Sequence, residues 1–288
     1  IVLTSANLEG ELISFKDHSF FDSFGDKLDY CLTHDREILS PLDDSVVREI
    51  ASKIRVLRMG RGYIPFELSL KETSAKPIMG LGSEIKSSAC LISNSKCEVS
   101  PHLGDLEHQS VYQSHISWQN HFEKKSPEPV LKIGDSHPDN PFFQESHIKI
   151  QHHMAHCMAV VAEHQLEGSW IGFAWDSFGY ASRHAWGAET FRVNEQKFER
   201  VATFRSFPWL AFDKSARYPW MSALSLLSEC CKNSDGILQK WPQLSHYANS
   251  SLIQFYLAQV NKKGTPRGAS VGRIIDAIAG ILQLCNQN

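Results

Sequence analysis

The chain has 288 residues, 42% hydrophobic and 21% charged, a composition typical of a globular protein that can fill a core. This length suits one large domain or two ordinary ones. The formal net charge of −3 comes without a basic run or stripe, so nucleic acid is excluded as an expected partner. No apolar run approaches bilayer length and no signal peptide is present, so no membrane partner is expected either.

Cysteine usage indicates a reducing compartment. The seven cysteines form an odd set without a Cys-x-x-Cys pair, which argues against a disulfide framework or a structural zinc knuckle. We therefore expect a cytoplasmic protein. The sequence opens at Ile1 without a methionine and stops at Asn288 within an apolar pattern, so we expect an internal piece of something longer.

Short strand patterns and polar turns fill the first 63 residues, with strands expected over 1–4 and 28–33. The first strand runs into a turn with Ser5 and Asn7, whose hydroxyl, amide and backbone groups can face a ligand, although such a turn is usually ordinary. Arg58 belongs to an arginine cluster further along. Such a cluster is commonly a solvated edge, but beside a Ser/Asn turn it can hold phosphates.

Residues 64–77 are rich in Pro, Ser and Thr and are predicted to link two domains. After them, strands over 77–81 and 89–93 are expected to form a hairpin whose tip carries Glu84 and Lys86. Such a tip can hold a phosphate through backbone donors and an ammonium group. The ordinary alternative is a solvated hairpin tip.

A helix is predicted over 109–125, followed by strands over 130–134 and 148–150. The next run has good helical propensity and carries His152 and His156, whose four-residue spacing puts both imidazoles on one helix face. Two imidazoles so placed form half of a metal site and need oxygen ligands from elsewhere. An isolated His-x-x-x-His is more often a surface pair.

An oxygen ligand is expected from the following segment. Residues 168–175 read as a buried strand with Asp176 at its carboxyl end. Ligands in α/β folds collect at the carboxyl ends of strands, where a carboxylate would complement the two imidazoles. The alternative is that this aspartate simply forms a turn.

The remaining sequence predicts helices over 215–232, 252–260 and 273–284. A Gly-rich loop over 264–272 opens the last of them. Such an entry to a helix N-terminus is a candidate nucleotide site, with a plain helix start as the equal alternative.

Many separate motifs resemble, in one order, the HypF carbamoyltransferase family of NiFe-hydrogenase maturation. They include Thr-Ser-Ala-Asn-Leu-Glu-Gly at 4–10 and Gly-Leu-Gly-Ser-Glu-Ile-Lys-Ser-Ser at 80–88. Any one of them would be weak, but the set covers nearly the whole chain. The others lie at 34–38, 43–48, 58–65, 102–107, 136–139, 151–156, 176–189 and 272–277.

The resemblance implies an α/β protein of two parts. Residues 1–70 would end a YrdC-like domain that forms carbamoyl-adenylate, and residues 71–288 would begin an actin/sugar-kinase-like (ASKHA) carbamoyltransferase domain. It also implies roles for individual residues. His152, His156 and Asp176 would hold iron or zinc, while His153, His164 and His137 would support the ligands or the fold. Lys86 and Glu84 would be catalytic residues at the nucleotide phosphates, and the nucleotide would contact Ser5, Asn7, Ser45, Arg58, Gly272 and Asp276.

The implied reaction uses ATP and carbamoyl phosphate to form carbamoyl-adenylate. The carbamoyl group would then pass to the C-terminal cysteine of a HypE-type maturation protein, with iron or zinc as the divalent metal and Mg2+ as a further ion. Two alternatives remain open. One is a carbamoyltransferase acting on a small-molecule hydroxyl, and the other is a degenerate scaffold that binds metal or a partner without turnover.

The chain departs from the family in its loops. The family usually reads Asp-Gly-Thr-Gly-Tyr-Gly and then Trp-Gly-Gly-Glu, whereas Ser177, Ala181 and Ala188 replace glycines here. The usual Leu-Pro-Gly-Gly-Asp has become Trp-Leu-Ala-Phe-Asp at 209–213. Because a new Cβ fills space in a close-approach loop, we expect lower catalytic efficiency with the metal ligands retained. We also expect no complete active site in this stretch alone.

Overall fold

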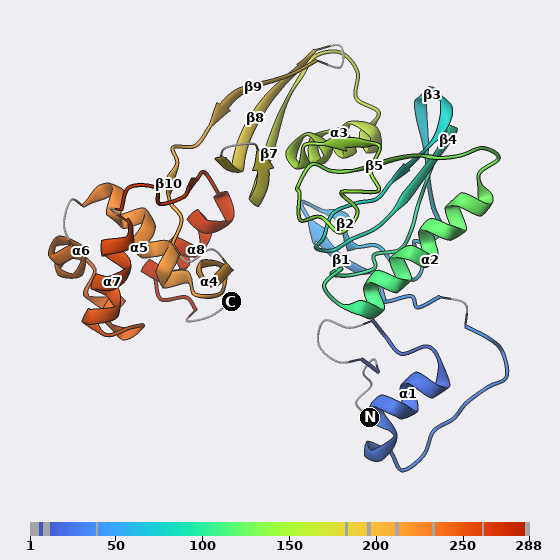
Figure 1. Ribbon diagram of the computed structural model, residues 1–288, viewed down its shortest axis with the longest axis horizontal. Helices are drawn as coiled ribbons and strands as arrows, with labels where there is room; N and C mark the ends of the chain where they lie inside the picture. Colours follow the sequence, from blue (N-terminus) through green and yellow to red (C-terminus); the bar gives the residue numbers. More distant parts are fainter. Residues whose placement is uncertain are drawn as a thin grey trace. The chain divides into compact units, whose positions relative to one another are not determined.

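The computed structural model describes residues 6–7, 12–38, 40–181, 184–194, 197–210, 213–231, 234–260 and 262–285, and the statements below concern these residues. The chain divides into two compact units, Ile1–Ile150 and Gln151–Asn288, each treated by itself. Both units combine helices and sheets, as the predicted α/β class requires (Figure 1). The predicted division at residues 70 and 71 stays a prediction.

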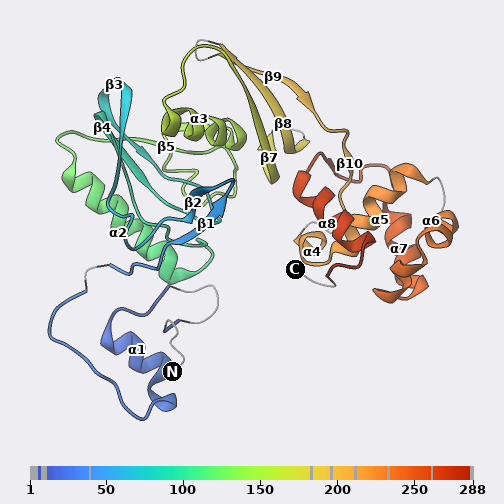
Figure 2. The ribbon, with the colours of Figure 1, turned by 180° about the vertical axis from the view of Figure 1, so that it is seen from behind.

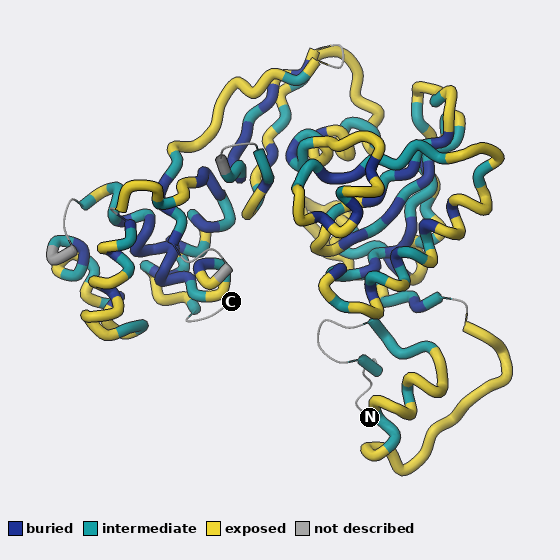
Figure 3. Tube along the Cα trace, viewed as in Figure 1, coloured by how far each residue is buried: buried dark blue, intermediate teal, exposed yellow. Residues whose placement is uncertain are grey.

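The N-terminal part of the first unit has few buried side chains. Helix α1 (Asp17–Phe24) and the 3-10 turn η1 (Gly25–Lys27) bury none, and Figure 3 shows the chain around α1 largely exposed. The strand predicted over 28–33 is wrong, since this stretch is irregular and Leu32 is fully exposed. Its apolar residues lack a partner strand and a surface to pack on. The strand predicted over 1–4 lies outside the described residues.

Strands β1 (Val46–Ile50) and β2 (Lys53–Arg58) form an antiparallel hairpin. Ala51 and Ser52 make the two-residue turn with φ values of 52° and 59°. Two positive φ angles match the right-handed twist of a tight hairpin, here without the usual Asn-Gly.

A four-stranded sheet in the order β4-β3-β5-β6 forms the centre of the first unit. Its strands are β3 (Phe66–Gly80), β4 (Cys90–Val99), β5 (Leu131–Asp135) and β6 (Ile148–Ile150). β3 and β4 are antiparallel, with Gly80 opposite Cys90, which confirms the predicted hairpin. β5 runs parallel to β3, and β6 runs parallel to β5.

The linker predicted over 64–77 is wrong, because residues from Phe66 onward belong to β3. Phe66, Leu68 and Leu70 are half-buried and alternate with exposed polar residues, which is the period of a strand. The serine, threonine and proline residues of this segment favoured a linker and so concealed the alternation. β3 tolerates Pro77 because its register against β4 shifts between Ser74 and Ile78.

Helix α2 (Gln109–Lys125) has the predicted bounds and covers the sheet (Figures 1 and 2). Val111 and Phe122 of α2 pack with Met79 and Leu81 of the β3 segment and with Phe142, all of them buried. This core sets the position of the loop that follows β3, which carries the predicted phosphate-binding residues.

In the second unit, helix α3 (His152–His164) lies against a sheet in the order β10-β11-β8-β7, with β9 also paired to β8. The strands are β7 (Trp170–Ala181), β8 (His184–Asn194), β9 (Lys197–Thr203), β10 (Phe207–Pro208) and β11 (Arg267–Gly268). Cys157 of α3 packs with Ala174, Phe191 and Val193 of the sheet.

β7 differs from its prediction in two respects. It is not buried on both faces, because Ile171, Phe173 and Trp175 are exposed. It also continues to Ala181, so Asp176 does not stand at its carboxyl end. Asp176 lies instead where the register against β8 shifts between Trp175 and Gly179. Such an irregularity redirects a side chain without ending the strand.

Helices make up most of the rest of the second unit: α4 (Asp213–Arg217), α5 (Pro219–Cys230), α6 (Ser234–Lys240), η2 (Pro242–His246), α7 (Ser250–Val260) and α8 (Val271–Ile281). The single helix predicted over 215–232 is two helices. They break at Tyr218, which is extended because it precedes Pro219. The helix predicted over 252–260 is confirmed as α7.

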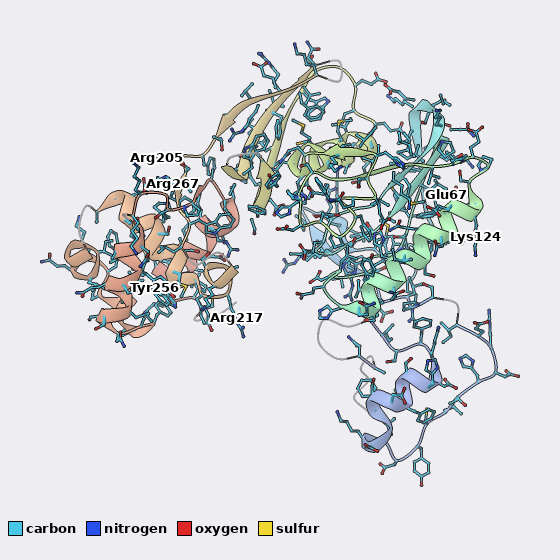
Figure 4. All side chains as sticks on the ribbon, in the orientation of Figure 1. Glu67, Lys124, Arg205, Arg217, Tyr256 and Arg267 are labelled. Atoms are coloured by element: carbon cyan, nitrogen blue, oxygen red, sulfur yellow. The ribbon has the colours of Figure 1, made fainter. Side chains whose placement is uncertain are left out.

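Helix α8 begins two residues before its predicted start at 273. Ser270 caps it by accepting a hydrogen bond from the Arg273 N–H at 3.1 Å. Beside the β10–β11 pair, Glu229 of α5 lies 2.9 Å from Arg267 and 3.6 Å from Arg205, and Figure 4 shows both arginines together. These contacts fasten the helices to the sheet near the entry to α8.

Candidate metal centre and anion pocket

The metal centre is built first from helix α3. Gln151 caps the helix by accepting a hydrogen bond from the Met154 N–H at 3.1 Å. The helix therefore begins at His152, and His156 follows one turn later on the same face. Their Nε2 atoms lie 3.1 Å apart.

Asp176 completes the cluster from β7. Its Oδ2 lies 3.1 Å from His152 Nε2 and 3.3 Å from His156 Nε2. All three possible ligand atoms lie within 4.8 Å of one another. The structure thus brings together the three residues that the sequence nominated as ligands, and it does so through an irregular strand rather than a strand end.

The charge of Asp176 suits a cation. Burial raises the pKa of its carboxyl, but hydrogen bonds from His152, His156 and the Ser177 N–H outweigh that effect and hold the pKa well below its usual range. The group is therefore a carboxylate. Two imidazole nitrogens and a carboxylate oxygen lie around one point at these distances, and a cation can replace the hydrogen bonds among them once both nitrogens present a lone pair. This N2O donor set fits zinc or iron.

The other histidines noted in the sequence have different surroundings. His164 is exposed in the last turn of α3. His137 belongs to the first unit, where its Nδ1 accepts a hydrogen bond from the Asp139 N–H at 3.1 Å. His153 is fully buried and lies beneath the cluster, 4.0 Å from Asp176 Oδ2.

A cavity of about 450 Å3 adjoins the metal centre and was not predicted. His156 and Asp176 line it together with apolar side chains of α3 and β7, including Val160, Phe173 and Trp175. The apolar residues at alternate positions of β7 were the available signal, but they were assigned to a strand buried on both faces.

A larger cavity, of about 690 Å3, lies in the first unit. It brings together Asn7, Arg58 and Lys86, which the sequence nominated in two separate groups. His102 and Asp105 also line it and were not singled out. Because the cavity joins the β2 segment to the loop after β3, its existence depends on packing between distant stretches of chain.

Lys86 has an unusual backbone in this cavity. Its φ is 52°, in the left-handed region, and its N–H donates to Asp105 Oδ1 at 2.7 Å. Non-glycine residues in this region are uncommon and tend to cluster at functional sites. Arg58 is held by the Asp44 carbonyl, which accepts from its Nε at 3.0 Å. The backbone of Lys86 and the guanidinium of Arg58 are thereby held at one cavity.

His102 adds a ring that stays uncharged at neutral pH. Burial lowers its pKa, the positive charges of Arg58 and Lys86 lower it further, and the carboxylates of Asp43 and Asp105 oppose them. The cavity therefore combines two cationic side chains with a neutral imidazole and the carboxylates of Asp43 and Asp105. The guanidinium and the ammonium are the groups that could bind a phosphate-bearing ligand.

Among the described residues of the first unit, the predicted residues Ser45 and Glu84 do not line this cavity. Ser45 is part of the turn scaffold, because its Oγ donates to the Arg61 carbonyl and accepts from the Gly60 N–H, both at 2.9 Å. Glu84 contributes its carbonyl oxygen to the Leu106 N–H at 2.8 Å. Ser5 lies outside the described residues.

The predicted nucleotide residues of α8 belong to the unit that carries the metal centre. Gly272 approaches Ser177, the neighbour of Asp176, so closely that a Cβ at Gly272 would overlap the Ser177 hydroxyl. Ser270 Oγ lies 3.5 Å from the Asp176 carbonyl oxygen. Asp276 forms an ion pair with Arg273 at 2.9 Å. The N-terminus of α8 thus packs on the part of β7 that carries Asp176, the candidate metal ligand.

Three family models match the chain. One described as carbamoyltransferase, Kae1-like domain, second subdomain, matches residues 172–288, and one described as HypF Kae1-like domain matches residues 73–163. A third, named for the YrdC group and described as telomere recombination, matches residues 1–60.

Curated relatives match along the whole chain. Carbamoyltransferase HypF of Synechocystis is 32% identical over 100% of this chain and 40% of its own length. Carbamoyltransferase HypF2 of Cupriavidus necator is 32% identical over 98% of this chain and 36% of its own length. The chain therefore spans about two fifths of these relatives.

Solved structures give the same result. A full-length HypF crystallised in a phosphate- and nucleotide-bound form is 26% identical, with a TM-score of 0.89 over 99% of this chain and 38% of its own. HypF of T. kodakarensis is 27% identical, with a TM-score of 0.87 over 99% of this chain and 40% of its own. These matches confirm the predicted α/β fold class of YrdC-like and Kae1-like parts.

Within the described residues, no helix combines the length and apolarity needed to cross a membrane. The ordered motifs of the sequence, the matching family models and the agreement with two solved HypF structures point to one family. The chain belongs to the carbamoyltransferase HypF family, whose members are enzymes.

Proposed function

We propose that this chain supplies metal- and nucleotide-binding parts of a carbamoyltransferase of NiFe-hydrogenase maturation. The reaction uses ATP and carbamoyl phosphate to form carbamoyl-adenylate, with release of pyrophosphate and phosphate. It then transfers the carbamoyl group to the C-terminal cysteine of a HypE-type protein, with release of AMP. The observation that carries the proposal is the cluster of His152, His156 and Asp176 in a chain of the HypF family.

A bound iron or zinc ion supplies Lewis acidity and a fixed point for an oxygen of the substrate. His152 and His156 hold it through Nε2, and Asp176 holds it as a carboxylate. His156 and Asp176 are 57% and 33% exposed and line the adjoining cavity, which leaves room for a further ligand on that side. The site is thus open, as catalytic metal sites are.

The nucleotide and the carbamoyl phosphate both bring phosphate groups, with Mg2+ as a further ion. Arg58 and Lys86 face one cavity and can balance that charge, and the amide of Asn7 offers a neutral partner. Their position on one cavity supports the assignment of Asn7, Arg58 and Lys86 to substrate binding.

The nucleophile comes from the partner. Cys157 is the cysteine beside the metal centre, and burial raises the pKa of its thiol, which makes it a poor nucleophile. An acceptor cysteine on a separate protein meets this need. The seven cysteines are free, in keeping with a reducing, cytoplasmic location.

A scaffold that binds metal without turnover is the second candidate. The contact between Ser177 and Gly272 favours it, because Ser177 adds a side chain where the family usually has glycine. That side chain occupies space between the metal ligand and the start of α8, where a phosphate or carbamoyl group would have to fit.

A chimera separates the two functions. Residues 1–288 of this chain replace the aligned segment of the Synechocystis relative. Release of AMP from ATP is then measured in the presence of a HypE-type acceptor protein, with and without carbamoyl phosphate. We expect release that depends on carbamoyl phosphate, and loss of that release in the His152→Ala/His156→Ala variant. Bound iron and zinc are measured on the same samples.

His164→Ala is the matched control, because it removes an exposed histidine from the other end of the same helix. It should keep both metal and AMP release. Metal binding without any AMP release would leave only the scaffold. Unchanged metal content in the double variant would reject the metal centre itself.

A further inference from the structure

The starting observation is a histidine beside the proposed metal ligands that is not itself one of the three grouped ligands. His153 lies between the two proposed ligands in sequence, yet its side chain is fully buried while His152 and His156 are 23% and 57% exposed. Its ring sits beside Gly179 of β7, where a Cβ would come within 2.6–3.0 Å of three ring atoms. The fold therefore keeps a glycine where the imidazole needs room.

The second observation is a buried carboxylate that grips this ring. Glu189 of β8 is fully buried, and its Oε2 lies 2.8 Å from His153 Nδ1. Three further groups bind the same carboxylate: the Ala188 N–H at 2.9 Å, Arg200 Nη2 at 3.1 Å and Thr203 Oγ1 at 3.2 Å. A carboxylate with so many partners has a fixed position, so it also fixes the ring.

The third observation is that the Nε2 edge of the His153 ring faces the carboxylate of Asp176. His153 Nε2 is 4.0 Å from Asp176 Oδ2, the same oxygen that faces His152 and His156. Asp176 Oδ1 accepts from the Ser177 N–H at 2.6 Å. The oxygen that would bind metal is therefore bordered on one side by a ring that cannot move.

We propose that His153, held by Glu189, is a positioning residue that keeps the carboxylate of Asp176 in place for the metal. This inference rests on the metal centre proposed above. A partner behind the ligands sets their orientation, and its loss typically costs 10- to 100-fold in metal affinity. Simple core packing is the competing explanation, and it predicts an effect on stability alone.

The test uses the whole chain with Zn2+ or Co2+ alone. Zn2+ affinity is measured by competition with a chromophoric chelator, and the visible spectrum of the Co2+ form reports the geometry of coordination. We expect His153→Gln and Glu189→Gln to weaken Zn2+ binding about 10- to 100-fold and to shift the Co2+ spectrum. The double variant should be no weaker than the worse single one, because the two residues act as one unit.

His164→Gln is the control, an exposed histidine of the same helix that should change neither readout. Arg200→Gln loosens Glu189 from the half-exposed side and should produce the same spectral shift with a smaller loss of affinity, which keeps the test decisive if a core variant fails to fold. Wild-type affinity and an unchanged Co2+ spectrum in the folded variants would overturn the inference while leaving the metal centre intact. A wild-type chain that binds neither ion would reject the metal centre as well.

Discussion

Ser177 fills the place that a side chain of Gly272 would need, so the β7 segment that carries Asp176 and the first turn of α8 are in direct contact. Ser177 is one of the positions where the sequence departs from the glycine that its resemblance to the HypF family leads us to expect. Glycine at both positions would leave a gap between β7 and α8, and the side chain of Ser177 fills that gap.

Gly272→Ala should therefore destabilise the second unit. Alanine is favoured over glycine inside a helix by about 1 kcal/mol, but overpacking costs about 1–3 kcal/mol and acts against backbone and hydroxyl atoms here. Ser177→Gly should restore stability to the Gly272→Ala protein. Denaturant unfolding of both single variants and the double variant measures this, and an additive double variant would contradict the contact.

Asp176→Asn should remove most metal binding without unfolding the chain. The amide keeps the shape of the side chain but loses the charge that balances a divalent ion. We expect a loss of at least about 10-fold in Zn2+ affinity, measured by chelator competition. Asp139→Asn, at an exposed carboxylate of the first unit, is the control.

Lys86 allows stability and binding to be separated. With φ at 52°, Lys86→Gly should be more stable than Lys86→Ala by about 1 kcal/mol, because alanine retains the strain of the left-handed region. Both variants should lose affinity for carbamoyl phosphate to a similar extent, since both lack the ammonium. Asn94→Gly, at an exposed residue with φ at 55°, should leave phosphate affinity unchanged.

His115 predicts how the stability of the first unit depends on pH. Burial lowers its pKa to about 4, and its Nδ1 lies 3.2 Å from Gln119 Nε2. Because the unfolded chain takes up this proton at a higher pH than the folded one, stability is complete above about pH 6.5 and falls as the pH drops toward 4. The loss should reach about 3 kcal/mol.

The measurement is the free energy of unfolding between pH 7 and pH 4.5, for the wild type and for His115→Gln. The variant should show a flatter dependence over this range. His121→Gln, at an exposed histidine of the same helix, should keep the wild-type slope. Equal slopes in all three proteins would refute the assignment.

The spacing of apolar and histidine side chains along the sequence predicted the helices whose faces it defines. Helix α2 has the predicted bounds because Val111 and Phe122 recur at helical spacing on its buried face and Ser126 begins an extended stretch. His152 and His156 were found for the same reason, since the spacing that defines a helix face is written in the sequence.

The features that the sequence did not predict depend on packing between segments that are distant along the chain. Nothing local indicates that Asp176 lies at a register shift within β7, because that depends on how β8 pairs with it. The same holds for the cavity shared by Arg58 and Lys86, and for the burial of Glu189 beside His153. The break at Tyr218, by contrast, was readable from the proline that follows it.

The contact between the Asp176 segment and α8 has a thermodynamic consequence. A ligand that shifts the first turn of α8 also acts on a metal ligand, through Ser177 and Ser270. Linkage is reciprocal, so any free energy by which such a ligand favours the ion must reappear as an equal gain in its own affinity once the ion is bound. If both sites are filled, a single coupling free energy therefore describes the effect of ion binding at Asp176 on ligand binding at α8 and the reverse effect.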